Sequence, residues 1–274
     1  MFHVLLYVLC WPPISIATPD SSVRTELYHR IVNAKHRGEL VELCNALGLV
    51  GNAAEVGVFR GTFSRHNLQR WHGMRYYMID AWAFRANDTA GGRTCSADKN
   101  SRSTDEHEEN YQISLKAVAE WRPPLSDRVV VIRKFSVAAA QEFPNEFFDF
   151  IYIDAGHEYR NVYRDLNAWW PKLRRGGMIA GDDFADFWDT FPGPRFHAQF
   201  HWGVKTAVAR FSREIGSPFF LTFADRGRGT AEMNPYLDDE WLADRPKAIR
   251  NFEEPPRKHA VRSQRFYPAW YLFK

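Results

Sequence analysis

The 274-residue chain has few cysteines, little net charge and no long apolar run. Its three cysteines, Cys10, Cys44 and Cys95, show no metal-binding or redox spacing, so no such cysteine site is predicted. The formal charge of +3 is too small, without a dense basic stripe, to predict a nucleic acid partner. No stretch reaches the length of a transmembrane helix, so we expect no stable membrane span.

The N-terminus allows two interpretations. Residues 2–11 form an apolar run of signal-peptide length, and Ser15-Ile16-Ala17 offers a small-residue cleavage site. No Lys or Arg precedes the run, and two prolines interrupt its end. Residues 1–19 are therefore either a signal peptide or a hydrophobic segment packed on the protein. The compartment, cytoplasm or secretory pathway, depends on that choice.

What the chain does have is enough apolar sequence for a sizeable core, with 45% hydrophobic residues. Residues 20–274 are predicted to form a single domain. Two poorly periodic stretches, 84–102 and 184–201, have the length of functional lids. The polar stretch 225–264 is predicted to be a surface excursion. Oligomeric state is left open, a homo-oligomer included.

The remaining sequence alternates between helical and strand patterns. Helical periodicity precedes Asn52, and five strand–helix units then follow, each with a short apolar run. A final pair of strands lies at 218–223 and 267–273. This order predicts a Rossmann-like, doubly wound, mostly parallel seven-stranded sheet with helices on both faces and an antiparallel C-terminal strand.

Acidic residues stand at the ends of two of these strands. Asp154 follows the run 148–153, and Asp182 and Asp183 follow 178–180, one β-α-β step later. Parallel neighbours end at the same edge of a sheet, so the three carboxylates are expected to converge there. A divalent cation such as Mg²⁺ would keep them ionised, which makes all three candidate metal ligands. The alternative is that Asp154 caps a helix and the other two are solvated loop acids.

A second candidate site lies at the end of the first strand. Gly57 permits a close backbone approach there, and Gly61 opens the turn into a helix whose N-terminus would face a ligand. The next strand ends in Asp80, which can accept both hydroxyls of a ribose. A nicotinamide-dependent oxidoreductase would need G-x-G-x-x-G, but Phe59 and Thr62 stand in its place.

Three long motifs resemble the class I S-adenosylmethionine-dependent methyltransferases, in particular the small-molecule O-methyltransferase-like group. They are Tyr152-Ile-Asp-Ala-Gly-His-Glu-Tyr159, Trp169-Trp-Pro-Lys-Leu173 and Gly176-Gly-Met-Ile-Ala-Gly-Asp-Asp-Phe184. Glu55-Val-Gly-Val-Phe-Arg-Gly61 is similar to the family's first glycine motif, and Gly203-Val-Lys-Thr-Ala-Val208 to a later helix. Where many members of the group have His-Asp, this chain has Asp182-Asp183.

The resemblance implies a set of roles. S-adenosyl-L-methionine would be bound by residues after the first three strands and at the end of the fourth: Glu55, Gly57, Phe59, Gly61, Asp80, Ala81, Trp82, Ser136 and Asp154. In metal-dependent members of the family the cation is held by acids at positions that match Asp154, Asp182 and Asp183. Aromatic residues that could wall the substrate or cofactor are Trp82, Tyr159 and Trp188, although core packing is the favoured interpretation for any one of them.

The predicted function is therefore an enzyme that methylates a hydroxyl oxygen of a small molecule or sugar, with Mg²⁺ assistance. Asp154 and His157 are the candidate catalytic residues, with neutral His157 as general base. His157 could instead only order its loop, and His201 could serve as base. A nicotinamide-dependent oxidoreductase and a non-catalytic binding protein that keeps the fold remain the alternatives.

Overall fold

A computed structural model describes residues 21–83, 103–121, 123, 125–184, 186, 203–222 and 268–274. The predicted N-terminal segment 1–19, the loop 84–102 and the excursion 225–264 lie outside these residues. So do most of 184–201, Trp188 and His201. Among the described residues, no helix combines the length and apolar character needed to cross a membrane.

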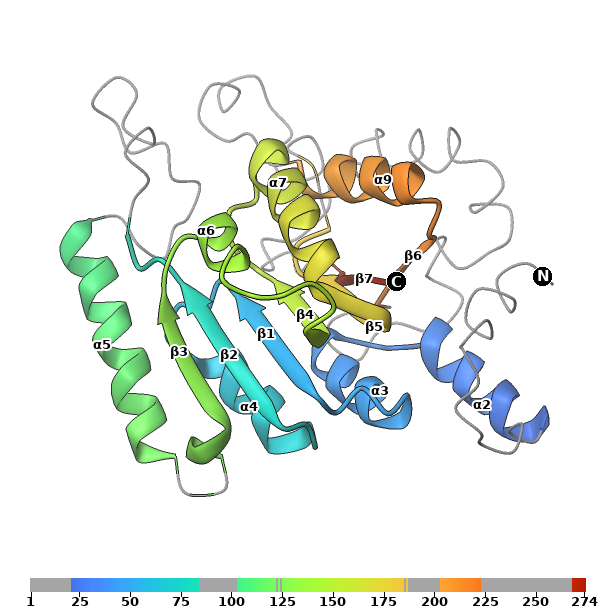
Figure 1. The fold of residues 1–274 in the computed structure, drawn as a ribbon, viewed down its shortest axis with the longest axis horizontal. Helices are drawn as coiled ribbons and strands as arrows, with labels where there is room; N and C mark the ends of the chain where they lie inside the picture. Colours follow the sequence, from blue (N-terminus) through green and yellow to red (C-terminus); the bar gives the residue numbers. More distant parts are fainter. Residues whose placement is uncertain are drawn as a thin grey trace, which may run out of the picture.

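The fold is built on a seven-stranded sheet in the order β3-β2-β1-β4-β5-β7-β6 (Figure 1). Only β7 runs antiparallel to its neighbours β5 and β6. The strands are β1 (Asn52–Val56), β2 (Arg75–Asp80), β3 (Val129–Arg133), β4 (Phe148–Ile153), β5 (Leu173–Gly181), β6 (Phe219–Leu221) and β7 (Trp270–Phe273). The predicted fold class, with its antiparallel C-terminal strand, is confirmed.

Helices cover both faces of the sheet (Figure 1). The helices and helical turns are α2 (Ser21–Val32), η1 (Arg37–Glu39), α3 (Leu40–Ala46), α4 (Thr62–Arg70), α5 (Thr104–Glu120), η2 (Ser126–Arg128), α6 (Ser136–Ala140), α7 (Tyr159–Trp169), η3 (Trp170–Lys172) and α9 (Val204–Ile215). α2, η1 and α3 precede β1, and the other helices lie between successive strands.

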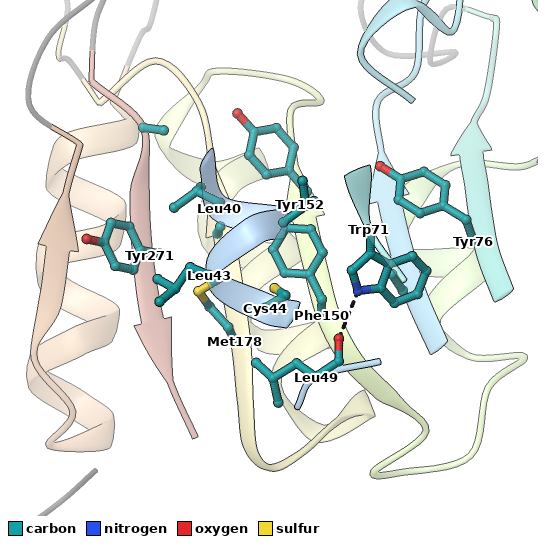
Figure 2. Packing of buried hydrophobic residues seen from close by; sticks show 14 of the residues in the cluster. Leu40, Leu43, Cys44, Leu49, Trp71, Tyr76, Phe150, Tyr152, Met178 and Tyr271 are labelled. Carbon is teal, nitrogen blue, oxygen red and sulfur yellow. Dashed lines mark hydrogen bonds between the residues drawn. The ribbon is translucent and has the colours of Figure 1, made fainter. Parts of the chain in front are cut away.

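Two hydrophobic clusters, one on each face, hold these layers together. On one face, α3 packs Leu40, Leu43 and Cys44 against Phe150 and other strand residues (Figure 2). On the other face, α7 and α9 lie against each other and cover β4 and β5. All six residues of β4 are buried, as expected for a central strand covered on both sides.

The helix α7 ends at Trp169, before the basic run and the two glycines at 174–177, and Leu173–Gly181 is already strand. Pro171 has no N–H to donate to a preceding carbonyl, so the α-helix tightens into a 3₁₀ turn instead. Gly176, at φ +72°, lies within β5 near the point where its register with β4 shifts.

Candidate functional site

The candidate site lies where β1, β2, β4 and β5 reach their carboxyl ends. Gly57, just after β1, has φ +95°, and a Cβ at this position would lie 1.9 Å from the carbonyl oxygen of Asp154. The Asp154 N–H also donates to the Val56 carbonyl (2.7 Å), and the Gly57 N–H donates to that of Ile79 (2.8 Å). Glycine is thus required here because the ends of β1 and β4 are in backbone contact.

Asp80, at the end of β2, organises the loop after β1. One carboxylate oxygen accepts hydrogen bonds from the N–H groups of Val58 (2.9 Å) and Phe59 (3.0 Å), and the other accepts one from Trp82 (2.8 Å). Phe59 and Trp82 both adopt positive φ, an uncommon conformation for large side chains. The Trp82 indole then donates to the Phe59 carbonyl at 2.7 Å. Asp80 therefore holds two unusual loop conformations beside the sheet edge.

Five of the predicted cofactor residues meet at this place: Gly57, Phe59, Asp80, Ala81 and Trp82. Gly61 is close by as the N-cap of α4, at φ +78°. The Trp82 ring itself is buried, with its centroid 4.8 Å from that of Tyr111. The ring of Trp82 is therefore part of the core, whereas its backbone belongs to the loop after β2.

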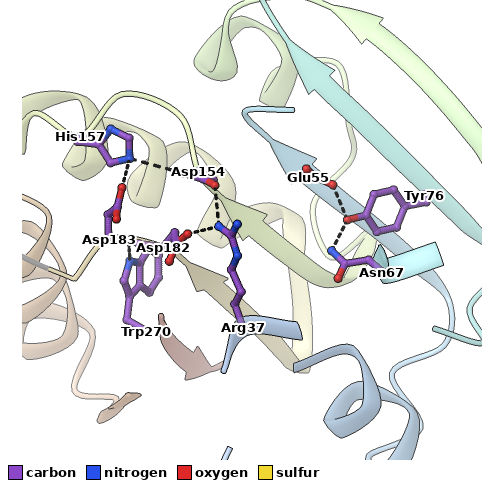
Figure 3. Close-up of polar contacts among 9 residues, drawn as sticks. All are labelled: Arg37, Glu55, Asn67, Tyr76, Asp154, His157, Asp182, Asp183 and Trp270. Atoms are coloured by element: carbon purple, nitrogen blue, oxygen red, sulfur yellow. Dashed lines mark hydrogen bonds and ion pairs between the residues drawn. The ribbon is translucent and has the colours of Figure 1, made fainter. Parts of the chain in front are cut away.

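Glu55 points into the core rather than toward the open edge. Its carboxyl group is fully buried and accepts a 2.7 Å hydrogen bond from the Tyr76 hydroxyl, which in turn accepts one from the Asn67 amide (Figure 3). Burial raises the pKa of Glu55 to about 8, against the opposing effect of the hydrogen bond from Tyr76. Glu55 is therefore mostly protonated at neutral pH.

Ser136, predicted near the adenine, is also bonded inward. Its hydroxyl donates to Asp165 (2.6 Å) and accepts a hydrogen bond from the Trp169 indole (2.9 Å). These two hydrogen bonds link α6 to α7. Tyr159, a predicted wall of the substrate site, begins α7 and accepts a hydrogen bond from Arg210 of α9 at its hydroxyl (2.7 Å).

The predicted catalytic and metal residues come together after β4 and β5 (Figure 3). The His157 Nε2 atom lies 3.0 Å from an Asp183 carboxylate oxygen and 3.5 Å from one of Asp154. Ligand atoms of Asp154, His157 and Asp183 all lie within 4.8 Å of one another. Burial lowers the pKa of His157, but the hydrogen bonds with Asp154 and Asp183 outweigh it and raise the pKa to about 10.

Asp182, the third predicted metal ligand, faces a different partner. It is paired with Arg37, from the turn η1 that precedes α3, and the same Arg37 Nη1 atom lies 3.4 Å from Asp154 (Figure 3). Asp154 thus stands between an imidazole on one side and a guanidinium on the other. Burial and the charges of Asp154 and Asp183 raise the pKa of Asp182, while Arg37 lowers it, with a net value of about 7.

Sequence reasoning missed Arg37. The residue is 117 positions from Asp154 and 145 from Asp182, and it lies in a polar turn between two helical segments. No periodicity marks such a position, so the sequence carries no local signal for it.

Residues 54–184 match the family model of the methyltransferase domain. No curated protein matches the chain. Solved structures with a similar fold include an O-methyltransferase from Bacillus cereus in complex with SAH, at 15% identity and a TM-score of 0.44, with 94% of each chain covered.

Two others are TomG of Streptomyces achromogenes and an enzyme of Geobacter metallireducens. TomG, an O-methyltransferase in complex with SAM, has 11% identity and a TM-score of 0.47, with 94% of this chain and 92% of that one covered. The precorrin-6y C5,15-methyltransferase of Geobacter metallireducens has 9% identity and a TM-score of 0.44, with 96% and 94% covered. At such identities and TM-scores these likenesses say nothing about substrate.

Proposed function

Residues 54–184 are a class I S-adenosylmethionine-dependent methyltransferase domain, and from this premise we propose that the enzyme methylates a hydroxyl oxygen of a small molecule. The proposal is carried by one observation. Two carboxylates and an imidazole, from Asp154, Asp183 and His157, converge at the sheet edge beside the glycine loop where the methyl donor would bind. A nucleic acid is not among the proposed substrates.

For the methyl donor, we propose a place over the loop that Asp80 organises. Gly57 lets the ends of β1 and β4 meet beside this place, and Gly61 opens α4 toward it. Asp80 already accepts three backbone hydrogen bonds, and since a carboxylate can accept about four, one position would remain for a ribose hydroxyl. Glu55 and Ser136 would support the donor site indirectly, because their buried hydrogen bonds hold β1 and α6 in place.

A divalent cation is the next part of the proposal, with Mg²⁺ as the expected ion. Asp154 and Asp183 supply the hard oxygen ligands that Mg²⁺ prefers, and their ligand atoms lie within 4.8 Å of each other, close enough to share one ion beside His157. Such an ion would lower the pKa of a substrate hydroxyl and orient it. Asp182 could join the ligands only by releasing Arg37.

His157 is the proposed general base. While both carboxylates bind it, the raised pKa keeps its imidazole protonated near neutral pH and unable to accept a proton. A cation on Asp154 and Asp183 would compete for those carboxylates and so lower the pKa of His157. Neutral His157 would then take the proton of the substrate hydroxyl, and bound S-adenosylmethionine would supply the methyl group.

The experiment compares Asp183→Asn with a matched control, Asp127→Asn, which replaces an exposed acid in the turn η2. Binding of S-adenosylmethionine is measured by calorimetry, and S-adenosylhomocysteine formation is measured against a panel of small hydroxyl compounds with Mg²⁺. Asp183→Asn should keep cofactor binding and lose turnover, whereas the control should lose neither. Turnover that persists in chelator would remove the cation from the mechanism, and turnover in His157→Ala would reassign the base.

A further inference from the structure

Arg37 brings a permanent positive charge to the carboxyl ends of β4 and β5. Its guanidinium pairs with Asp182 and lies 3.4 Å from Asp154, and it stacks 4.6 Å from the centre of the Phe63 ring of α4. The Phe63 ring in turn packs on Tyr152 of β4, with centroids 4.7 Å apart. The guanidinium is therefore held by two carboxylates and an aromatic face, a set of partners suited to arginine.

The turn that carries Arg37 is itself fixed in place. Gly38 lies so close to α4 that a Cβ would stand 2.5 Å from the His66 Nε2 atom, and that nitrogen lies 3.3 Å from the Gly38 carbonyl oxygen. On the side of α2, the Tyr271 hydroxyl of β7 donates to the Ile31 carbonyl. Arg37 thus approaches the site from a backbone that is anchored on both sides.

The charges divide the three acids into two groups. Asp183 faces only the His157 side, Asp182 pairs with Arg37, and Asp154 is shared between them. We propose that Arg37 is an internal cation that fills the place between Asp154 and Asp182, so that an added divalent cation is confined to Asp154 and Asp183, beside His157, and binds there less tightly than it would without Arg37. The inference rests on the proposed cation site, and it assigns Arg37 as a positioning residue of that site.

Replacing Arg37 should therefore tighten cation binding. In Arg37→Gln the positive charge next to Asp154 is gone, and Mn²⁺, used as a paramagnetic probe, should bind at least about ten-fold more tightly than in wild type. Arg37→Lys keeps the charge and should stay near the wild-type affinity. Arg30→Gln removes an equal charge from an exposed pair with Glu26 on α2, and it should change nothing.

Mn²⁺ affinity is measured by electron paramagnetic resonance and calorimetry on the full chain, with S-adenosylmethionine affinity and thermal unfolding of each sample. If Arg37→Gln does not fold, Arg37→Met, whose stem can still pack on Phe63, takes its place. The proposal is supported if Mn²⁺ binds more tightly to Arg37→Gln or Arg37→Met, and not to Arg37→Lys or Arg30→Gln, than to wild type. An unchanged or weaker affinity, or no binding in any variant, overturns it.

The same data separate this inference from the proposed function. If wild type binds Mn²⁺ and Asp183→Asn does not, the cation site stands whatever Arg37→Gln does. If S-adenosylmethionine binds while Mn²⁺ never does, the methyltransferase assignment stands, and both the cation and the role of Arg37 are lost.

Discussion

Replacement of Gly57 by alanine tests the close approach of β1 and β4 on which the site depends. The new Cβ would lie 1.9 Å from the Asp154 carbonyl oxygen and 2.7 Å from the Ala155 nitrogen, both of which are backbone atoms. Real Cβ contacts stay at or beyond 3.0 Å, so the two strand ends would have to separate by about 1 Å. The positive φ adds strain of its own.

Gly48 supplies the matched control. Its φ is positive too, at +69°, but nothing lies within 4 Å of a Cβ placed there. Gly48→Ala should therefore cost only the backbone strain, about 1 kcal/mol of unfolding free energy. Gly57→Ala should cost roughly 2 to 4 kcal/mol beyond that, because packed strand ends cannot move apart without losing contacts.

Urea unfolding followed by circular dichroism gives both free energies, and calorimetry gives the affinity for S-adenosylmethionine. We expect Gly57→Ala to lose most of that affinity, since the loop after β1 would shift with the strand end. Gly48→Ala should keep it. Equal stability losses in the two variants would show that the ends of β1 and β4 are not in backbone contact.

Three further perturbations follow from the hydrogen bonds. Asp80→Ala should weaken S-adenosylmethionine binding several-fold or more in calorimetry, because the N–H groups of Val58, Phe59 and Trp82 lose their acceptor; unchanged affinity would contradict this. Arg128→Ala should cost about 2 to 4 kcal/mol in urea unfolding, since its guanidinium donates to three carbonyls at the end of α4, and a cost below 1 kcal/mol would count against it. Glu55 has a folded pKa of about 8, above its usual 4.5. Wild type should therefore lose unfolding free energy relative to Glu55→Gln as pH rises from 4.5 to about 8, by at most about 1.4 kcal/mol per pH unit, and should lose none outside that range. Stability curves that stay parallel across this range would refute the prediction.

The sequence by itself determined the architecture of the described residues. Strand runs such as 148–153 and amphipathic helices such as α7 follow from local periodicity, and parallel connections then bring Asp80, Asp154 and Asp183 to one edge. The methyltransferase motifs are also local, since each lies in one short stretch of chain. These features could be predicted because each depends on residues close together in sequence and on general rules of sheet assembly.

The tertiary structure decided which partner each side chain has. Glu55 and Ser136 belong to the predicted cofactor set, yet their polar groups bond to Tyr76 and Asp165 in the core. The periodicity of a strand or helix predicts which face a side chain lies on, but it does not identify the polar group that the side chain meets there.

The division of the three acids is the clearest case. Their convergence was predictable, but Asp183 faces His157 and Asp182 faces Arg37. Arg37 reaches Asp182 across 145 positions of sequence because the turn that carries it packs against α4, and the following helix α3 packs on one face of the sheet. Such a contact depends on how distant segments pack, and no local pattern of residues carries it.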